Sequence, residues 1–249
     1  MNTKDWDERR KIIIPGNKEE TITFCVEHFI KCANDAIKDH GSFFVALSGG
    51  STPKAMFELL SEKYADQVDW SKVQLFWSDE RSVKPENPDS NFNMAMRSGF
   101  AKLPLPKDHI HRMVAEDNIE QNAKAYEKAI HQILGSYPFD LVMLGMGEDG
   151  HTASLFPGTE GLKENTRKVI ANFIPEKETW RMTMTFPLIN RAQNIAIYVL
   201  GEGKKERILS VLSEKDKTRL LPSARVGTKE NPAVWIADTG ASALISSSL

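Results

Sequence analysis

The sequence has 249 residues, of which 41% are hydrophobic, and its formal net charge at pH 7 is -2. This apolar content is enough for a folded core and argues against a disordered chain. The near-neutral charge gives no electrostatic case for nucleic-acid binding, although a basic pocket for a small anion remains compatible with it. The length fits one large domain or two small ones.

Residues 1–8 are polar and charged, and no apolar run approaches the ~20 residues of a membrane span. We therefore expect a cytoplasmic protein without membrane contact. Both cysteines, Cys25 and Cys32, fall in one predicted helix, which places them ~10 Å apart along its axis. This separation is too long for a disulfide, so two buried thiols in a reducing compartment are expected.

Apolar periodicity, with glycine and proline at the boundaries, predicts strands that alternate with helices. Gly41 ends the first long helix, and Pro53 suits the first turn of the next one. In the first half we expect a short edge strand at 11–14, a helix at 21–38, a buried strand at 43–47, a helix at 53–64, a strand at 73–77, and helices at 91–100 and 119–134.

In the second half we expect a buried strand at 139–144, two partly exposed strands at 169–173 and 181–186, a buried strand at 194–200, a helix at 204–212, a last strand at 233–237 and a frayed tail at 246–249. This alternation predicts an α/β fold with a doubly wound, mostly parallel sheet and helices on both faces. No repeat or linker marks a boundary, so residues 1–249 are expected to form a single domain.

Four loops follow predicted strands, and they begin at Ser48, Asp79, Gly145 and Gly201. The carboxyl ends of parallel strands lie along one edge of a sheet, where open α/β sheets bind their ligands. We therefore expect the four loops to share one site.

The first loop, residues 48–52, contains two glycines, two serines and a threonine directly before a helix. Free backbone N–H groups and the helix dipole make such a loop a cradle for an anion. The Gly-Lys-Ser/Thr ending of a P-loop is absent. A plain tight turn with a helix cap is the alternative interpretation.

The loop at 145–151 places His151 among three glycines, with Asp149 two residues before it. A histidine is the usual general base near neutral pH, and Asp149 could hold one ring nitrogen and fix the tautomer. The alternative is a histidine that merely closes a turn. The glycine spacing matches a dinucleotide fingerprint formally, but the acids in the turn would repel a pyrophosphate.

Charged residues accompany the remaining strand ends: Asp79, Arg81, Arg181 and Lys204. Arginine suits bidentate contact with phosphate or carboxylate, although each of these charges could also be a solvated surface group. There is no nucleophile elbow, no cysteine near a loop and no diagnostic metal spacing. Direct attack by water on an activated carbonyl, such as an internal ester, fits these residues and would need no metal.

Five blocks of the sequence closely resemble the 6-phosphogluconolactonase family: 46–53, 78–81 with 88–91, 144–158, 181–185 and 201–204. The resemblance runs in order from about residue 10 to about residue 240, and its most specific part is 149–158. It implies a NagB-like, Rossmann-related fold. It also implies hydrolysis of a small phosphosugar lactone, 6-phosphoglucono-1,5-lactone, to 6-phosphogluconate. This is the second step of the oxidative pentose phosphate pathway and uses no cofactor. A monomer or weak homo-oligomer is expected.

The resemblance also assigns roles to residues. His151 would activate water and then protonate the leaving ring oxygen, while Asp149 would orient it. Asp79 would position Arg81 or a sugar hydroxyl. The groups expected around the sugar phosphate are Ser48, Gly49, Gly50, Ser51 and Thr52, and those expected to supply positive charge to the phosphate or to the oxyanion are Arg81, Arg181 and Lys204.

Two alternatives stay open. Glucosamine-6-phosphate deaminase resembles the chain in the Gly-Ser-Thr-Pro and Asp-Gly-His blocks, but it has Asp-Glu-Tyr where residues 79–81 read Asp-Glu-Arg. It also has a catalytic glutamate in the block where residues 154–157 read Ser-Leu-Phe-Pro. The other alternative is a non-catalytic sugar-phosphate sensor, although such regulators carry an added helix-turn-helix.

Overall fold

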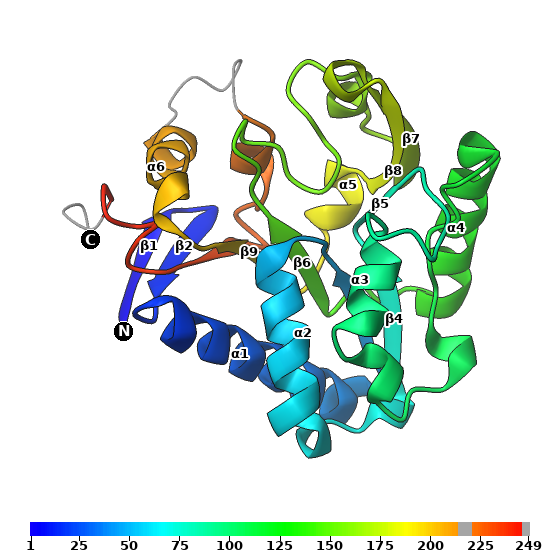
Figure 1. The fold of residues 1–249 in the computed structure, drawn as a ribbon, viewed down its shortest axis with the longest axis horizontal. Helices are drawn as coiled ribbons and strands as arrows, with labels where there is room; N and C mark the ends of the chain where they lie inside the picture. The colour runs from blue at the N-terminus through cyan, green and yellow to red at the C-terminus, as the bar shows by residue number, and fades with distance from the viewer. Residues whose placement is uncertain (214–220, 246–249) are drawn as a thin grey trace.

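A computed structural model describes residues 1–213 and 221–245, so the tail expected to fray at 246–249 lies outside the described residues. Its main sheet has the strand order β1-β2-β10-β9-β6-β3-β4 (Figure 1), and every neighbouring pair is parallel except β1 and β2. The predicted α/β fold with a mostly parallel sheet is confirmed. The strands are β1 (Asn2–Asp7), β2 (Arg10–Ile14), β3 (Phe43–Leu47), β4 (Val73–Trp77), β6 (Leu141–Gly145), β9 (Ile195–Val199) and β10 (Ala233–Ala237).

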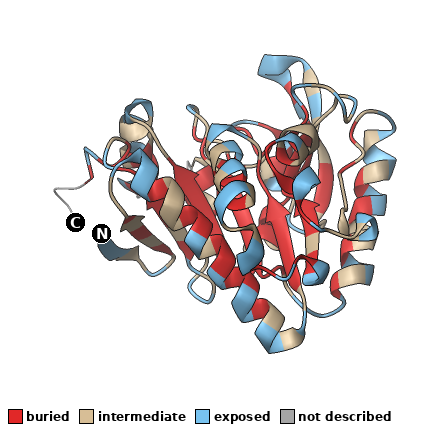
Figure 2. Cartoon of the chain, turned by 60° about the horizontal axis from the view of Figure 1, so that its bottom comes forward, coloured by how far each residue is buried: buried red, intermediate tan, exposed pale blue. Residues whose placement is uncertain are grey.

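The core lies on both faces of this sheet. Every residue of β3 and of β9 is buried, as the apolar sequences Phe43–Leu47 and Ile195–Val199 predict for parallel strands that are covered on both sides. Figure 2 shows buried strands throughout the sheet, with helices that are buried on the inner side and exposed on the outer side. The largest fully buried side chains include Trp77, Trp235, Phe29, Phe43, Phe57 and Phe76.

The helices are α1 (Lys18–His40), α2 (Ser51–Lys63), α3 (Asn91–Arg97), α4 (Ile119–Leu134), α5 (Phe186–Ile189) and α6 (Lys205–Ser213). Helix α1 begins three residues before the predicted start, because Asn17 and Glu20 form a capping box ahead of the apolar periodicity. Gly41, with φ 84°, ends it as predicted. Short 3-10 helices, η1 to η8 in chain order, lie at Ala65–Gln67, Trp70–Lys72, Phe100–Lys102, Lys107–His109, Glu160–Lys163, Pro175–Lys177, Glu202–Lys204 and Pro222–Arg225.

A second sheet has the order β5-β8-β7, with antiparallel pairs only, and is built from β5 (Asp79–Arg81), β8 (Thr179–Met184) and β7 (Val169–Ile174). The sequence predicted a loop at 79–81 and one sheet overall, so both expectations are wrong here. Ser78 connects the sheets: its N–H donates to the Leu47 carbonyl at 2.8 Å, and its own carbonyl accepts from Met184 N–H at 2.8 Å. One residue therefore carries the chain from the end of β4 into the second sheet.

Other elements also differ from the prediction. The strand predicted at the edge, β2, is an inner strand, because β1 pairs with it in antiparallel register. The helix predicted to reach residue 100 ends at Arg97, since Gly99 takes a φ of 149° and a 3-10 helix follows. A side chain would be strained in that conformation, so the helix cannot continue through this residue.

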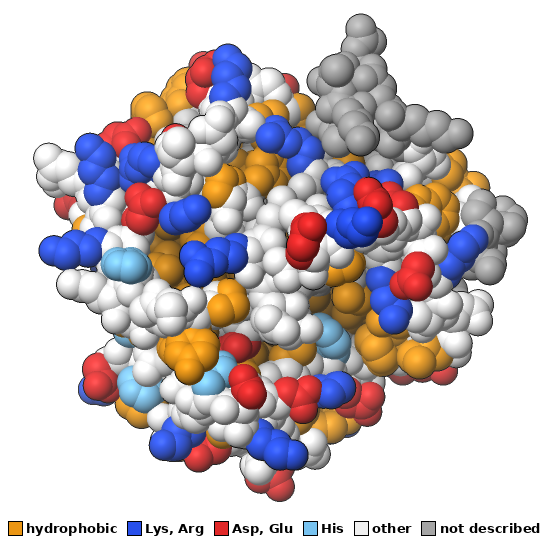
Figure 3. All heavy atoms as spheres, turned by 180° about the vertical axis from the view of Figure 1, so that it is seen from behind, with side chains coloured by type: hydrophobic (Ala, Val, Ile, Leu, Met, Phe, Trp, Pro, Cys, Tyr) orange, Lys and Arg blue, Asp and Glu red, His pale blue; other side chains and the backbone are white. Residues whose placement is uncertain are grey.

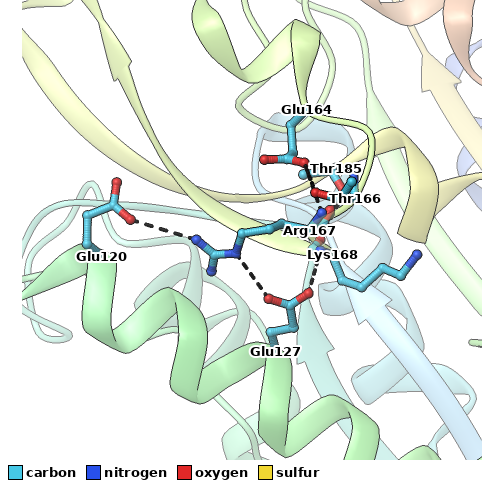
Figure 4. A network of polar contacts seen from close by, with 7 residues as sticks. All are labelled: Glu120, Glu127, Glu164, Thr166, Arg167, Lys168 and Thr185. Atoms are coloured by element: carbon cyan, nitrogen blue, oxygen red, sulfur yellow. Dashed lines mark hydrogen bonds and ion pairs between the residues drawn. The ribbon is translucent and has the colours of Figure 1, made fainter.

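A polar network ties α4 to the second sheet (Figure 4). Glu127 of α4 accepts hydrogen bonds from the Nε of Arg167 at 3.3 Å and from the backbone N–H of Lys168 at 2.6 Å. The Arg167 guanidinium also lies 3.9 Å from Glu120, and the Thr185 hydroxyl donates to the Arg167 carbonyl at 2.5 Å. The segment that enters β7 is therefore fixed both to α4 and to the end of β8.

Candidate active site

A pocket of about 220 Å³ opens at the carboxyl ends of the parallel strands. Strand β4, which follows β3 in the sequence, lies on one side of β3, whereas the later strand β6 lies on the other side. The strand order therefore reverses between β3 and β6. Such a reversal leaves a crevice beyond the strand ends, which is where open α/β sheets bind ligands. All four predicted loops contribute, as expected. The pocket is lined by Ser48, Gly49, Gly50, Ser51, Thr52, Pro53, Asp79, Arg81, Asn91, Gly145, Met146, Gly147, His151, Ala153, Tyr198, Val199, Leu200 and Lys204.

His151 lies in this pocket, and its ring is held by Asp149 from behind. The carboxylate Oδ1 of Asp149 is 2.5 Å from the ring Nδ1 and also accepts the backbone N–H of His151 at 3.0 Å. Partial burial alone would raise the pKa of Asp149, but the hydrogen bonds and charge of His151 lower it below its ordinary value. A carboxylate on Nδ1 favours the proton there, so Nε2 is left as the basic nitrogen.

The His151 ring is also fixed by packing. It stacks on Phe156, with ring centroids 3.9 Å apart and planes inclined by 18°. On another side it lies against Gly147, where a Cβ atom would come within 2.1 Å of the ring Nδ1. The N–H of Gly147 donates to the His151 carbonyl at 2.9 Å and closes the turn. Glycine at 147 is therefore a condition for the position of the imidazole.

The 48–52 loop forms the opposite wall. Gly50, with φ 104°, directly precedes α2, and no side chain caps the first N–H groups of this helix. No acidic residue occupies its first turn. These N–H groups and the dipole of a 13-residue helix therefore point positive charge toward the pocket. Gly49 permits close approach of Asn91, because a Cβ there would lie 2.0 Å from the Asn91 Oδ1 atom.

Asp79 and Glu80 are buried and organise the wall that carries Arg81. Asp79 Oδ2 accepts from the Ser154 hydroxyl at 2.6 Å, and Oδ1 accepts from Asn91 Nδ2 at 3.2 Å. Glu80 accepts backbone N–H groups of Arg81, Asn91 and Phe92 at 2.7–2.8 Å and the Ser90 hydroxyl at 3.0 Å. Burial nevertheless raises the pKa of Glu80, against the effect of these donors.

Two of the three predicted cations line the pocket. Arg81 and Lys204 line the pocket, whereas Arg181 lies beside Arg81 as its direct partner in the β5–β8 ladder. One Arg81 NH group donates to the Asp89 carbonyl at 2.7 Å, and the Nε atoms of Arg81 and Arg181 are buried without a hydrogen-bond partner. Burial, and then the charge of Arg81, lowers the pKa of Arg181. The guanidinium groups of Arg81 and Arg181 therefore have Nε–H donors that an anion could accept from.

The structure brings nine of the predicted site residues to the pocket surface. Asp149 and Arg181 are not among its lining residues, and each instead contacts or neighbours one that is. Sequence reasoning did not assign roles to Asn91 and Glu80, although Asn91 closes one of the resembling blocks. Both could have been found only by knowing that β5 folds back over α3. The nine are Ser48, Gly49, Gly50, Ser51, Thr52, Asp79, Arg81, His151 and Lys204.

The described residues form neither a metal-binding cluster nor a membrane-spanning helix. Within residues 1–213 and 221–245, no group of three or more His, Cys, Asp or Glu side chains is arranged to hold a metal ion. Over the same ranges, no helix combines the length and apolar character that crossing a membrane requires. The thiols of Cys25 and Cys32 are both buried and unpaired with each other, as predicted.

The family model described as glucosamine-6-phosphate isomerases/6-phosphogluconolactonase matches residues 16–235 of the chain. The chain is 38% identical over 233 residues to a protein of Chlamydia pneumoniae named 6-phosphogluconolactonase, covering 93% of this chain and 89% of that one. It is 32% identical to the chloroplastic 6-phosphogluconolactonase 3 of Arabidopsis thaliana, over 95% of this chain and 75% of that one.

Solved structures of related proteins have a similar fold. The fold is similar to that of 6-phosphogluconolactonase from Trypanosoma cruzi, with a TM-score of 0.84 and 25% identity over 99% of this chain and all of that one. A monomeric glucosamine-6-phosphate deaminase matches with a TM-score of 0.77 at 18% identity, over 94% of this chain and 99% of that one. The latter likeness concerns the fold alone.

Proposed function

Because the chain belongs to the glucosamine-6-phosphate isomerase/6-phosphogluconolactonase family, we propose that it hydrolyses 6-phosphoglucono-1,5-lactone to 6-phosphogluconate. This would be the second step of the oxidative pentose phosphate pathway. The observation that carries the proposal is the pairing of His151 with Asp149 at a pocket that is also lined by Arg81 and Lys204 and by the uncapped start of α2.

Binding of the substrate would rest on its phosphate. Arg81 and Lys204 line the pocket, Arg181 adds charge behind Arg81, and the start of α2 offers backbone N–H groups. A dianionic phosphate matches such donors through charge-assisted hydrogen bonds. The buried Asp79 and Asn91 side chains, which are fixed on each other, offer polar atoms to the sugar hydroxyls.

The chemical step would begin at Nε2 of His151. This nitrogen takes a proton from a water molecule as the water oxygen forms a bond to the lactone carbonyl carbon. The resulting tetrahedral oxyanion is stabilised by the surrounding cations or N–H groups. The bond from carbon to the ring oxygen then breaks, and the imidazolium returns its proton to that oxygen. The histidine ends in its starting state, and the product is the open-chain acid.

Asp149 would act through His151. Its carboxylate on Nδ1 keeps the imidazole in the tautomer with a basic Nε2 and stabilises the imidazolium that forms during attack. The stack on Phe156 would keep the ring plane fixed during the proton transfers. The pocket-lining residues named above suffice for these steps, and we propose that the protein acts as a monomer or a weak homo-oligomer.

A direct assay tests the proposal. Freshly prepared 6-phosphogluconolactone is added to the protein, and acid release is followed above the spontaneous rate, with ammonia release from glucosamine 6-phosphate measured in parallel. We expect lactone hydrolysis that His151→Gln reduces by at least ~10² while 6-phosphogluconate still binds. Ammonia release alone would reassign the chain to deamination, and binding of both sugars without turnover would reassign it to sensing.

A further inference from the structure

A second hollow, of about 400 Å³, lies between α4 and the segments at 134–139 and 188–191. It shares no lining residue with the active-site pocket. Its volume falls within the range of ~300–1,000 Å³ that is usual for small-molecule sites. The residues that line it are Lys124, Glu127, Lys128, Ile130, His131, Leu134, Gly135, Tyr137, Pro138, Phe139, Lys168, Leu188 and Arg191.

The inner surface of this hollow is apolar. Ile130 and Leu134 of α4 face it together with Phe139 and Leu188, and all four side chains are buried in the core cluster. Tyr137 forms part of the wall and is half exposed, at 50%. Its ring is stacked on His40 with centroids 4.6 Å apart, which holds Tyr137 in place along the wall. A polar molecule such as a sugar would lose hydration on this surface and gain few hydrogen bonds in return.

The rim, in contrast, carries four cations. Lys124 and Lys128 lie one helical turn apart on α4, and Lys168 and Arg191 come from the other side of the hollow. Within the described part of the chain, none of the four forms an ion pair with an acidic side chain. Figure 3 shows the molecule from behind, so α4 lies on its left side, where basic side chains, with some acidic ones among them, surround hydrophobic atoms.

The one acidic residue in the lining is already engaged. Glu127 accepts hydrogen bonds from the Arg167 guanidinium and from the backbone N–H of Lys168. Figure 4 shows the Lys168 ammonium group extending away from this network instead of toward the carboxylates. The hollow therefore keeps an uncompensated positive rim above its apolar floor.

We propose that this hollow binds a small amphipathic carboxylate, namely the anion of a medium-chain fatty acid. The aliphatic chain would lie on the exposed ring of Tyr137 and over the accessible edges of Ile130, Leu134 and Leu188, where burial of apolar surface favours binding. The carboxylate would lie at the rim, where lysine and arginine can donate charge-assisted hydrogen bonds. The active-site pocket also holds cations, but its lining is more polar, with serine, threonine and carboxylate groups that suit a phosphosugar better than an aliphatic chain.

The test uses decanoate below its micellar concentration, with decanol and decyltrimethylammonium as neutral and cationic probes of equal chain length. Calorimetry should give one decanoate per chain and clearly weaker binding of the other two. Methyl NMR should show shifts at Ile130, Leu134 and Leu188. The double variant Lys128→Glu/Lys168→Glu should weaken decanoate binding roughly tenfold or more.

A matched double variant, Lys63→Glu/Lys72→Glu, changes the net charge equally at exposed positions away from the hollow and should leave decanoate affinity unchanged. Equal affinity for decanoate and decanol, or methyl shifts confined to other parts of the chain, would overturn the proposal. Displacement of decanoate by 6-phosphogluconate would overturn it as well, because it would place the fatty acid in the active-site pocket. Since the hollow shares no residue with that pocket, failure here leaves the proposed lactonase activity intact.

Discussion

Arg81 and Arg181 are direct partners across the ladder of β5 and β8, so their side chains leave the second sheet on the same face. Two like charges placed opposite each other destabilise a sheet unless an anion lies between them. Both Nε atoms are buried and lack a hydrogen-bond partner. Asp79, Glu80 and Asp89 offset part of this repulsion, and under the proposed function a dianionic ligand between the two guanidinium groups would offset the rest.

Replacing Arg81 separates these two effects. We expect Arg81→Gln to weaken binding of 6-phosphogluconate by about 1.5–3 kcal/mol, the range for a hydrogen bond to a charged group. The unliganded protein should melt at the same temperature as wild type or higher, since a like-charge contact is gone. Calorimetric titration and thermal melting measure the two quantities. Arg97→Gln, at an exposed helix position, serves as the control, and a ligand affinity unchanged in Arg81→Gln would remove this residue from the binding site.

Replacing Gly147 tests how strongly kcat depends on the position of the His151 imidazole. A methyl group at this residue would lie 2.1 Å from the His151 Nδ1 atom and 2.7 Å from the Asp149 Oδ1 atom, so Gly147→Ala must displace the paired side chains. We expect kcat to fall by about 10²-fold, as for other ångström-scale displacements of catalytic groups, while KM changes little. Gly203→Ala is the matched control in a neighbouring loop, because its added Cβ meets no atom within 4 Å. Equal kcat values for the two variants would show that the ring position is not critical.

Glu80 should control the stability of the wall that holds Arg81. Its buried carboxylate accepts hydrogen bonds from Ser90 and from three backbone N–H groups, and a glutamine amide cannot accept through its nitrogen. We expect Glu80→Gln to lower the free energy of unfolding by about 1–3 kcal/mol and to raise KM. Urea unfolding and steady-state kinetics test this, with the exposed Glu86→Gln as the control. A wild-type KM in a destabilised variant would separate the fold of this segment from substrate binding.

The pH dependence of stability should report on Asp149. Its folded-state pKa lies below the ordinary value, because hydrogen bonds and charge from His151 outweigh partial burial. The stability it contributes is therefore present above the unfolded pKa of ~3.9 and is lost as pH falls through the lower folded pKa. Unfolding free energies measured between about pH 5 and pH 2 should decline less steeply for Asp149→Asn than for wild type. Identical slopes would mean that this carboxylate has no specific partner in the folded state.

Long apolar segments made most of the main sheet predictable. The sequences of β3 and β9 consist almost wholly of aliphatic and aromatic residues, and both lie buried where expected. The loops at Ser48 and Gly145 could be placed in one site because parallel strands share a carboxyl edge. The direction of the strands alone is enough to predict that these loops are neighbours, and the four loops do meet in one pocket.

The second sheet was not predictable in the same way. Strand β5 has three residues, Asp-Glu-Arg, and no local pattern separates so short a polar strand from a loop. It exists because Ser78 joins the two sheets and because β8, a hundred residues later, supplies its partner. The roles of Glu80 and Asn91 depend on that pairing, so local sequence patterns could not predict them.

Strand β1 escaped prediction for a related reason, since its sequence, Asn-Thr-Lys-Asp-Trp-Asp, is polar and mostly exposed. It closes one flank of the main sheet, while Ile110 bridges to Leu75 of β4 at the opposite flank. A chain shortened to begin at Glu8 would leave the inner strand β2 with a bare ladder of backbone donors and acceptors. Such open ladders recruit other molecules, so we expect the shortened protein to self-associate and precipitate with rising concentration, even with its catalytic machinery intact.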